Sequence, residues 1–191
     1  VDAAEMKLSS CDLGMSAFSS KHLAWTAPSD PSDSSMTRSI PMSGPGLSGH
    51  SFHSHTDTEV ILAAYVEWGK GSLQKFNGMF AFAIWDSLEK TLFIARDKFG
   101  EKPLSFAHLP NGGIVFSSEI KALLSHPDVS KNPDIESIQL MLNFGYVPSP
   151  RSAFEDIKKL PPAHFLIWRN KSFTMTKYWE PPTEVTERKS E

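Results

Sequence analysis

The 191-residue sequence contains a single cysteine, Cys11, so no disulfide can form within the chain and no cysteine cluster can hold a metal. Basic runs are also absent: 19 lysine and arginine residues against 22 acidic residues give a formal net charge of -3. The charge pattern therefore provides no electrostatic footprint for nucleic acid or an anionic membrane. No apolar run approaches the roughly 18 residues of a membrane-spanning helix, and no charged-then-apolar leader is visible. These absences predict a soluble, cytoplasmic protein with neither a nucleic-acid nor a membrane partner.

The residues that are present divide the chain into two compositional regions. Residues 1–50 contain 12 serines, 4 prolines and 4 glycines, which supply turns and solvated backbone but little to bury. The apolar residues there, Trp25 among them, recur at no steady period, so we predict neither helix nor strand. We expect three parts: a Ser/Pro-rich, disordered segment over 1–46, one folded domain over 47–180, and a tail over 181–191.

The predicted domain begins with a helix and a doubly buried strand. Thr56 and Glu59 have the spacing of a capping box, and the residues that follow place apolar side chains at helical spacing: Ile61, Ala64, Tyr65 and Trp68. Residues 79–85 are apolar on both alternating faces, with Phe80, Phe82 and Ile84 on one face and Met79, Ala81, Ala83 and Trp85 on the other. Such a strand is typical of a sheet covered on both sides.

The rest of the domain alternates strands with short helices. Turn signals predict further strands at 92–95, near Leu104, at 114–116, and as a hairpin about Asn170 and Lys171. Ser117 or Ser118 is expected to cap a short helix. A second helix is expected to begin with Asn132 as cap and Pro133, to end at Gly145, and to face inward through Ile135, Ile138 and Leu142. The pattern predicts a layered α+β sandwich.

Six motifs occur in a fixed order along this domain: TDTEV, FNGMFAFAIWD, LFIARDKFGEKPL, FSSEIKALL, FGYVPSPR and KLPPAHFL. Together they resemble the glutamine amidotransferase domain of the asparagine synthetase family. The resemblance implies an N-terminal-nucleophile hydrolase fold, here partial, in which a four-layer αββα sandwich holds its antiparallel sheets between helices. It also implies a glutaminase domain whose intact relatives hydrolyse glutamine and pass ammonia to an aspartyl-adenylate to make asparagine.

The family's nucleophile is a cysteine at the first position, where the thiolate attacks glutamine and the residue's own amine can act as base. This sequence begins at Val1 and has neither the family's Asn-Gly-Glu loop nor its Arg-Leu segment. Cys11 is interpreted as a bystander thiol, because too few residues separate it from Asp57 to hold the missing strands and loops. We therefore predict no catalytic residue in this chain. It is expected to be a truncated glutaminase domain or, alternatively, a catalytically inactive association module.

Asp57 is the one substrate-binding residue that the resemblance implies. In the family this aspartate binds the α-ammonium group of glutamine, and a carboxylate suits a small cation whose position must be fixed. The alternative is an acidic first-turn residue favoured by the helix dipole, and both roles can hold together. ATP and Mg belong to the family's synthetase domain, so we expect no cofactor and no metal in this chain. The expected partners are weakly bound glutamine and either a synthetase domain or a second copy.

Other polar residues receive structural interpretations. Arg96 and Asp97 follow a buried strand and are interpreted as an ion pair or turn anchor that shapes the FGEKPL segment. Glu119 is interpreted as a first-turn carboxylate of a helix. Asn77 and Gly78 are interpreted as the entry to the following strand rather than as oxyanion donors.

Two further features receive no chemical role. The histidines His50, His53 and His55 lack cysteines or convergent carboxylates around them in sequence, so they are interpreted as an exposed polar stretch. Ala163 stands where the family usually has glycine before His164, so the local turn is expected to differ slightly.

Overall fold

The structure is a computed structural model that describes residues 15–19, 25–26 and 57–182. Its first sheet has the order β1-β3-β4-β8-β9, from β1 (Met15–Ser19), β3 (Ala81–Asp86), β4 (Thr91–Arg96), β8 (His164–Arg169) and β9 (Ser172–Lys177). The second has the order β2-β6-β5-β7, from β2 (Trp25–Thr26), β6 (Ile114–Ser117), β5 (Ser105–His108) and β7 (Ile157–Lys159). Every pairing in both sheets is antiparallel.

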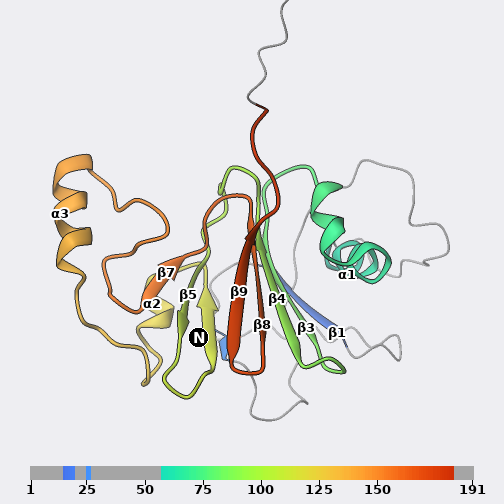
Figure 1. The fold of residues 1–191 in the computed structure, drawn as a ribbon, viewed down its shortest axis with the longest axis horizontal. Helices are drawn as coiled ribbons and strands as arrows, with labels where there is room; N and C mark the ends of the chain where they lie inside the picture. The colour runs from blue at the N-terminus through green and yellow to red at the C-terminus, as the bar shows by residue number, and fades with distance from the viewer. Residues whose placement is uncertain (1–14, 20–24, 27–56, 183–191) are drawn as a thin grey trace, which may run out of the picture.

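Helices lie on the outer faces of both sheets, as Figure 1 shows. The helix α1 (Asp57–Trp68) and the 3-10 helix η1 (Gly69–Gln74) cover the first sheet. The short helix α2 (Ile120–Leu123) packs on the second sheet, and α3 (Ile135–Phe144) lies beyond it. The α+β prediction of antiparallel sheets between helical layers is confirmed.

The strand β3 separates two hydrophobic clusters, as its sequence predicts. Phe80, Phe82 and Ile84 belong to the cluster under α1, whereas Ala81, Ala83 and Trp85 belong to the cluster between the sheets. The partner strand β4 divides its side chains in the same way, with Phe93 towards α1 and Ile94 towards the second sheet. Apolar side chains on both faces therefore place β3 and β4 in the middle of the sandwich.

The two strands of the N-terminal region were not predicted. The strand β1 pairs with β3, and β2 pairs with β6, so the expectation of no strand in this region is wrong for residues 15–19 and 25–26. Both pair with strands more than 60 residues later in the chain, which a local periodicity cannot reveal. The expected boundary near residue 46 stays a prediction.

Met79 and the inward face of α3 require correction. Met79 precedes β3 and is 51% exposed, because the ladder that fixes side-chain alternation begins only at Ala81. In α3, Ile135 and Leu142 are 61% and 78% exposed, so these residues do not face the core. The only buried residue of α3 is Ser137. Gly145 ends this helix in the left-handed conformation, as expected.

Two helix caps also differ from the predicted ones. Asp134, rather than Asn132, is the N-cap of α3, because its carboxylate accepts a hydrogen bond from the Ser137 amide at 3.1 Å. In α2 the N-cap residue is Glu119, without a side-chain cap. The Ser117 hydroxyl instead accepts a hydrogen bond from the Glu119 amide at 3.2 Å. The N-cap is the residue with extended backbone geometry directly before the helix, here Glu119 and Asp134, and the type of residue alone does not identify it.

Two hairpin turns meet across the sandwich. The predicted hairpin at Asn170 and Lys171 is confirmed, with both residues at positive φ, as a two-residue type I′ turn requires. The indole of Trp168 donates a hydrogen bond to the Gly112 carbonyl at 3.0 Å, and His108 Nε2 lies 3.1 Å from the Lys171 carbonyl. This clasp joins the β8–β9 hairpin to the β5–β6 hairpin.

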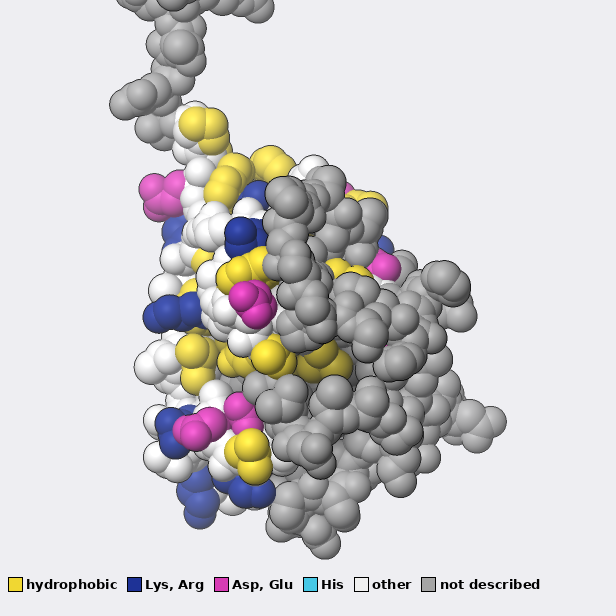
Figure 2. All heavy atoms as spheres, turned by 90° about the vertical axis from the view of Figure 1, so that its right-hand side faces the viewer, with side chains coloured by type: hydrophobic (Ala, Val, Ile, Leu, Met, Phe, Trp, Pro, Cys, Tyr) yellow, Lys and Arg dark blue, Asp and Glu magenta, His cyan; other side chains and the backbone are white. Residues whose placement is uncertain are grey.

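Among the described residues, no helix is both long enough and apolar enough to cross a membrane. Figure 2 views the molecule from the side that carries α1, and its described surface intersperses basic with acidic side chains.

Candidate functional site

The candidate site begins at Asp57, the first residue of α1. This position places the carboxylate beside the helix N-terminus, where backbone N–H groups and the helix dipole favour negative charge. Its Oδ2 atom is buried and has no hydrogen-bond partner among the described residues. Burial raises the pKa of Asp57 above its usual value. A buried carboxylate oxygen without a partner is costly, and a cationic ligand would offset that cost.

Two hydroxyl groups of the same helical layer share this property. Thr58, next to Asp57, is 2% exposed, and Ser72 of η1 is fully buried. Within the described ranges, neither hydroxyl has a hydrogen-bond partner. Sequence analysis missed both as candidate polar contacts. Thr58 lies within the TDTEV motif, which offers a signal, but nothing in the sequence around Ser72 distinguishes its hydroxyl.

Asp97 organises the turn after β4 and is 1% exposed. Its carboxylate accepts backbone hydrogen bonds from Phe99 at 3.1 Å, Glu101 at 3.0 Å and Lys102 at 3.0 Å. The Asp97 amide donates to the Phe80 carbonyl at 2.8 Å, which ties this turn to the start of β3. The carboxylate is thus occupied by the backbone, which confirms the interpretation of Asp97 as a turn anchor.

Arg96 anchors the same turn from the other side. Its guanidinium donates to the carbonyls of Lys102 at 2.7 Å, Leu160 at 2.6 Å and Gly100 at 2.6 Å. Burial lowers the pKa of Arg96, and the neighbouring Asp97 carboxylate acts in the opposite direction. Each nitrogen of the guanidinium has a backbone partner, so the structure gives this residue a positioning role.

Two residues at this turn have left-handed backbone conformations. Gly100 has φ +68°, and a Cβ there would lie 2.7 Å from Pro162 Cγ and 3.1 Å from Arg96 Cζ. Ala163, in the position where glycine is usual, has φ +57° and donates its amide hydrogen bond to the Asp97 carbonyl at 2.8 Å. Tyr178 donates its phenolic proton to the Arg96 carbonyl at 2.9 Å, and burial raises its pKa.

The remaining predicted residues do not join this site. Asn77 and Gly78 are exposed in the loop before β3, and Gly78 has φ +121°, which supports their interpretation as a strand entry. Cys11, Thr56 and the histidines at 50, 53 and 55 lie outside the described residues. Within the described residues, no group of three His, Cys, Asp or Glu side chains could hold a metal ion.

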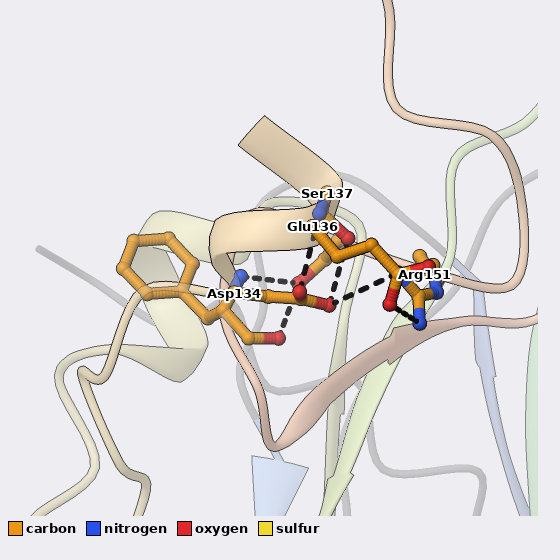
Figure 3. Close-up of polar contacts among 6 residues, drawn as sticks. Asp134, Glu136, Ser137 and Arg151 are labelled. Carbon is orange, nitrogen blue, oxygen red and sulfur yellow. Dashed lines mark hydrogen bonds and ion pairs between the residues drawn. The ribbon is translucent and has the colours of Figure 1, made fainter. Parts of the chain in front are cut away.

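A separate polar network holds the base of α3, as Figure 3 shows. Arg151 lies 2.6 Å from Glu136 and 3.9 Å from Asp134, and Ser137 donates its hydroxyl proton to Asp134 at 2.8 Å. The hydrogen bonds from Ser137 hold the pKa of Asp134 below its usual value, and Arg151 acts in the same direction. Glu136, Ser137 and Asp134 are paired within this network, whereas Arg151 Nη1 is buried without a hydrogen-bond partner among the described residues. The network holds the first turn of α3 in place.

Comparison with known proteins identifies the family. Residues 46–179 match a family described as the glutamine amidotransferase domain. The chain is 36% identical over 137 residues to asparagine synthetase [glutamine-hydrolyzing] 3 of Bacillus subtilis, covering 71% of this chain and 22% of that protein. It is 35% identical over 131 residues to a putative asparagine synthetase [glutamine-hydrolyzing] 2 of Methanocaldococcus jannaschii, covering 66% of this chain and 25% of that protein.

The chain therefore belongs to the glutamine amidotransferase domain family, and its curated relatives include asparagine synthetases. It spans only 22% and 25% of the length of the two relatives above. Among solved structures, it is similar to the glutamine phosphoribosylpyrophosphate amidotransferase of Bacillus subtilis. That likeness has a TM-score of 0.47 and 19% identity, and it covers 70% of this chain and 25% of the other.

Proposed function

We propose that this domain recognises glutamine through Asp57, as part of a protein that uses glutamine as a source of ammonia for amide synthesis. The buried, unpartnered Oδ2 atom of Asp57 carries the proposal. A free amino acid presents an α-ammonium group, and its bond to a carboxylate is charge-assisted and directional. The family assignment supports glutamine as the amino acid concerned.

In this proposal the chain contributes recognition, and the chemistry that follows is divided among other groups. Cleaving the side-chain amide needs a nucleophile and donors for the oxyanion, and we expect this chain to supply neither. Use of the ammonia on an activated carboxylate, with ATP and Mg, would belong to a synthetase region such as the named relatives imply. The acceptor would be aspartate if the parent protein makes asparagine.

The binding experiment is a glutamine titration followed by the backbone amide signals of α1. We expect weak binding, with a dissociation constant on the order of 1 mM or higher, since few contacts remain. Asp57→Asn removes the charge with little change in shape and should abolish the signal changes. Glu59→Gln is the matched control, because it removes an acidic charge from the same first turn. If both variants lose the glutamine-induced signal changes equally, glutamine is attracted by the general negative charge of the first turn and is not recognised by Asp57 specifically.

The stability of Asp57→Asn makes this test interpretable. Because burial raises the pKa of Asp57, its charge lowers the stability of the folded state as pH rises through that pKa. The variant should therefore unfold at the same temperature as the parent at pH 7, or at a higher one. Lost binding with retained stability assigns the effect to recognition.

Ammonia release from glutamine tests the catalytic half of the proposal, with the parent chain and Cys11→Ala side by side. We expect no release above background from either. Release that requires Cys11 would overturn the interpretation of this thiol as a bystander.

An association module is the second candidate function, and the edge strand β9 favours it. All six residues of β9 are exposed. A chain that binds no glutamine but forms a stable complex through this edge would match that candidate.

A further inference from the structure

The strand β9 forms an edge of the first sheet and is paired on one side only, with β8. It has no proline, bulge or charge in its centre, which are the usual devices that protect an edge from pairing with another chain. The Lys177 at its end is the one charged residue of the strand. Within the part of the chain that the structure describes, the centre of β9 is therefore a regular ladder without such protection.

Hydrogen-bond alternation identifies which backbone groups of β9 are free. The Tyr178 amide donates to the Ala163 carbonyl at 2.8 Å, so this opposed pair is a hydrogen-bonded one. In an antiparallel ladder such pairs alternate along the strand. The residues that point their N–H and C=O groups towards β8 are therefore Ser172, Thr174 and Thr176. Those that point them outward are Phe173, Met175 and Lys177, and these outward groups make no hydrogen bond within the described residues.

The other sheet provides an instructive contrast at its edge strand β7. That strand has three residues, two of them lysines. The Lys159 amide donates to the Pro150 carbonyl at 2.7 Å, and its ammonium group donates to the Val147 carbonyl at 2.7 Å. A short, charged strand covered by a loop is protected in the ways that β9 is not.

The sequence of β9 is complementary to itself in one antiparallel register. If Met175 faces Met175 of a second copy, Phe173 faces Lys177 and Thr174 faces Thr176. Every outward N–H and C=O group of both strands then gains a partner, because each of the outward residues lies in a hydrogen-bonded pair. In this register no like charges face one another, and the cross-strand pairs of Thr174 with Thr176 stabilise the contact between the two strands.

The partly exposed apolar side chains of β9 also suit pairing with a second β9. Phe173 and Met175 are 37% and 41% exposed, although Phe173 packs edge-on against Phe106 with ring centroids 5.5 Å apart. Since Phe173, Met175 and Lys177 alternate onto one face, a second β9 would place its own apolar side chains beside them. Lys177 would extend its apolar stem along Phe173 of the other copy.

We propose that two copies of this chain associate through β9, so that the first sheets of both copies form one continuous antiparallel sheet about a two-fold axis at Met175. The proposal is independent of glutamine binding. A strand-to-strand interface is small, so the dissociation constant is expected to be on the order of 10 µM.

Sedimentation velocity across a range of concentrations tests this association with the whole chain. The parent should shift from monomer to dimer with rising concentration. Met175→Pro removes an outward N–H without removing a bond to β8, so it should stay monomeric and folded. Met175→Lys should also be monomeric, because the register places the two lysines opposite each other. Circular dichroism of both variants checks that the fold is retained.

A charge-pair mixture tests the register itself. Met175→Glu alone should be monomeric, whereas an equal mixture of Met175→Glu and Met175→Lys should form a heterodimer. A parent that stays monomeric at several hundred micromolar would overturn the proposal. So would a dimer that survives Met175→Lys but is lost in Leu142→Glu, because that result would assign association to α3. A mixture that fails to associate would refute the Met175 register.

Discussion

The helices α1 and α3 follow similar apolar patterns in sequence, but the molecule uses them in opposite ways. The α1 helix buries Ile61 and Ala64 against the first sheet, and Tyr65 lies 4.9 Å from Phe93 between ring centroids. The α3 helix buries only Ser137, and Figure 1 shows it standing apart from both sheets. Packing along its length holds α1, whereas polar contacts at its N-terminus hold α3.

This difference shows that apolar residues at helical spacing predict an apolar face on the helix. They do not show whether another part of the molecule covers that face. Ile135, Ile138 and Leu142 have the spacing of a buried stripe, yet Leu142 is the most exposed large apolar residue of α3. A helix of ten residues gains little from propensity alone, so its ends become decisive when its side is uncovered. The contrast can be sharpened or broken by the following substitutions.

The largest difference is expected between phenylalanines on the two sides of the molecule. Phe93→Ala removes a 1%-exposed ring from the cluster under α1 and should lower the free energy of unfolding by about 4 kcal/mol. Phe144→Ala removes a 63%-exposed ring from α3 and should change it by less than about 0.5 kcal/mol. Urea denaturation measures both. A large loss in Phe144→Ala would mean that α3 is packed in solution.

The next effect concerns anchoring by a single carboxylate. Asp97→Ala removes the acceptor of three backbone hydrogen bonds and should lower the free energy of unfolding by about 3 kcal/mol. Asp128→Ala is the control, because Asp128 is exposed. The two variants are compared by the same denaturation experiment. Similar losses would contradict the anchoring role of Asp97.

A glycine substitution at the same turn should have a smaller cost. Gly100→Ala combines φ +68° with a Cβ 2.7 Å from Pro162 Cγ and should lower the free energy of unfolding by about 2 kcal/mol. A Cβ at Gly71 would meet nothing within 4 Å, so Gly71→Ala should change stability by less than about 0.5 kcal/mol. Thermal unfolding distinguishes them. If Gly100→Ala is as stable as Gly71→Ala, the turn is looser than its contacts indicate.

The smallest effect is confined to α3 and depends on pH. Since hydrogen bonds from Ser137 depress the pKa of Asp134, its stabilising effect is complete above the ordinary aspartate value of about 3.9 and is lost as pH falls through the folded pKa. Hydrogen-exchange protection of α3 amides should therefore fall several-fold at low pH while α1 amides change less. Asp134→Asn retains a capping group but cannot titrate there, so it should remove this pH dependence. Persistence of the dependence would assign it to another group.

The central strands could be predicted from the sequence because the evidence for them lies within each strand, in apolar side chains that occur on both of its faces. Residues Phe80 to Trp85 carry apolar side chains on both faces, and only the middle of a layered sandwich accommodates them. The Asn170-Lys171 turn was predictable for a similar reason, since a two-residue hairpin accepts few backbone conformations.

The incorrect or missed features depend on residues distant in the chain. No local pattern around Trp25 indicates that β2 pairs with β6. At the candidate site, the motif pointed to Asp57, but the unpartnered state of its Oδ2 atom emerged only from the surrounding fold. The anchoring role of Arg96 was anticipated in kind, whereas its bond to Leu160, 64 residues later, was not.

The Trp168 hydrogen bond of the hairpin clasp and the hydrogen bonds of Arg96 together restrain the first sheet. Trp168 pairs with Leu92 near the N-terminal end of β4, and Arg96 is the last residue of that strand. The Trp168 side chain donates a hydrogen bond to the Gly112 carbonyl, and the Arg96 side chain donates one to the Leu160 carbonyl. Both carbonyls lie outside the first sheet. Because these two hydrogen bonds lie at opposite ends of β4, they oppose both sliding and separation of the first sheet relative to the rest of the domain. The apolar cluster between the sheets, which includes Ile94 and Leu166, therefore lies between two side-chain hydrogen bonds that tie the first sheet to the rest of the domain.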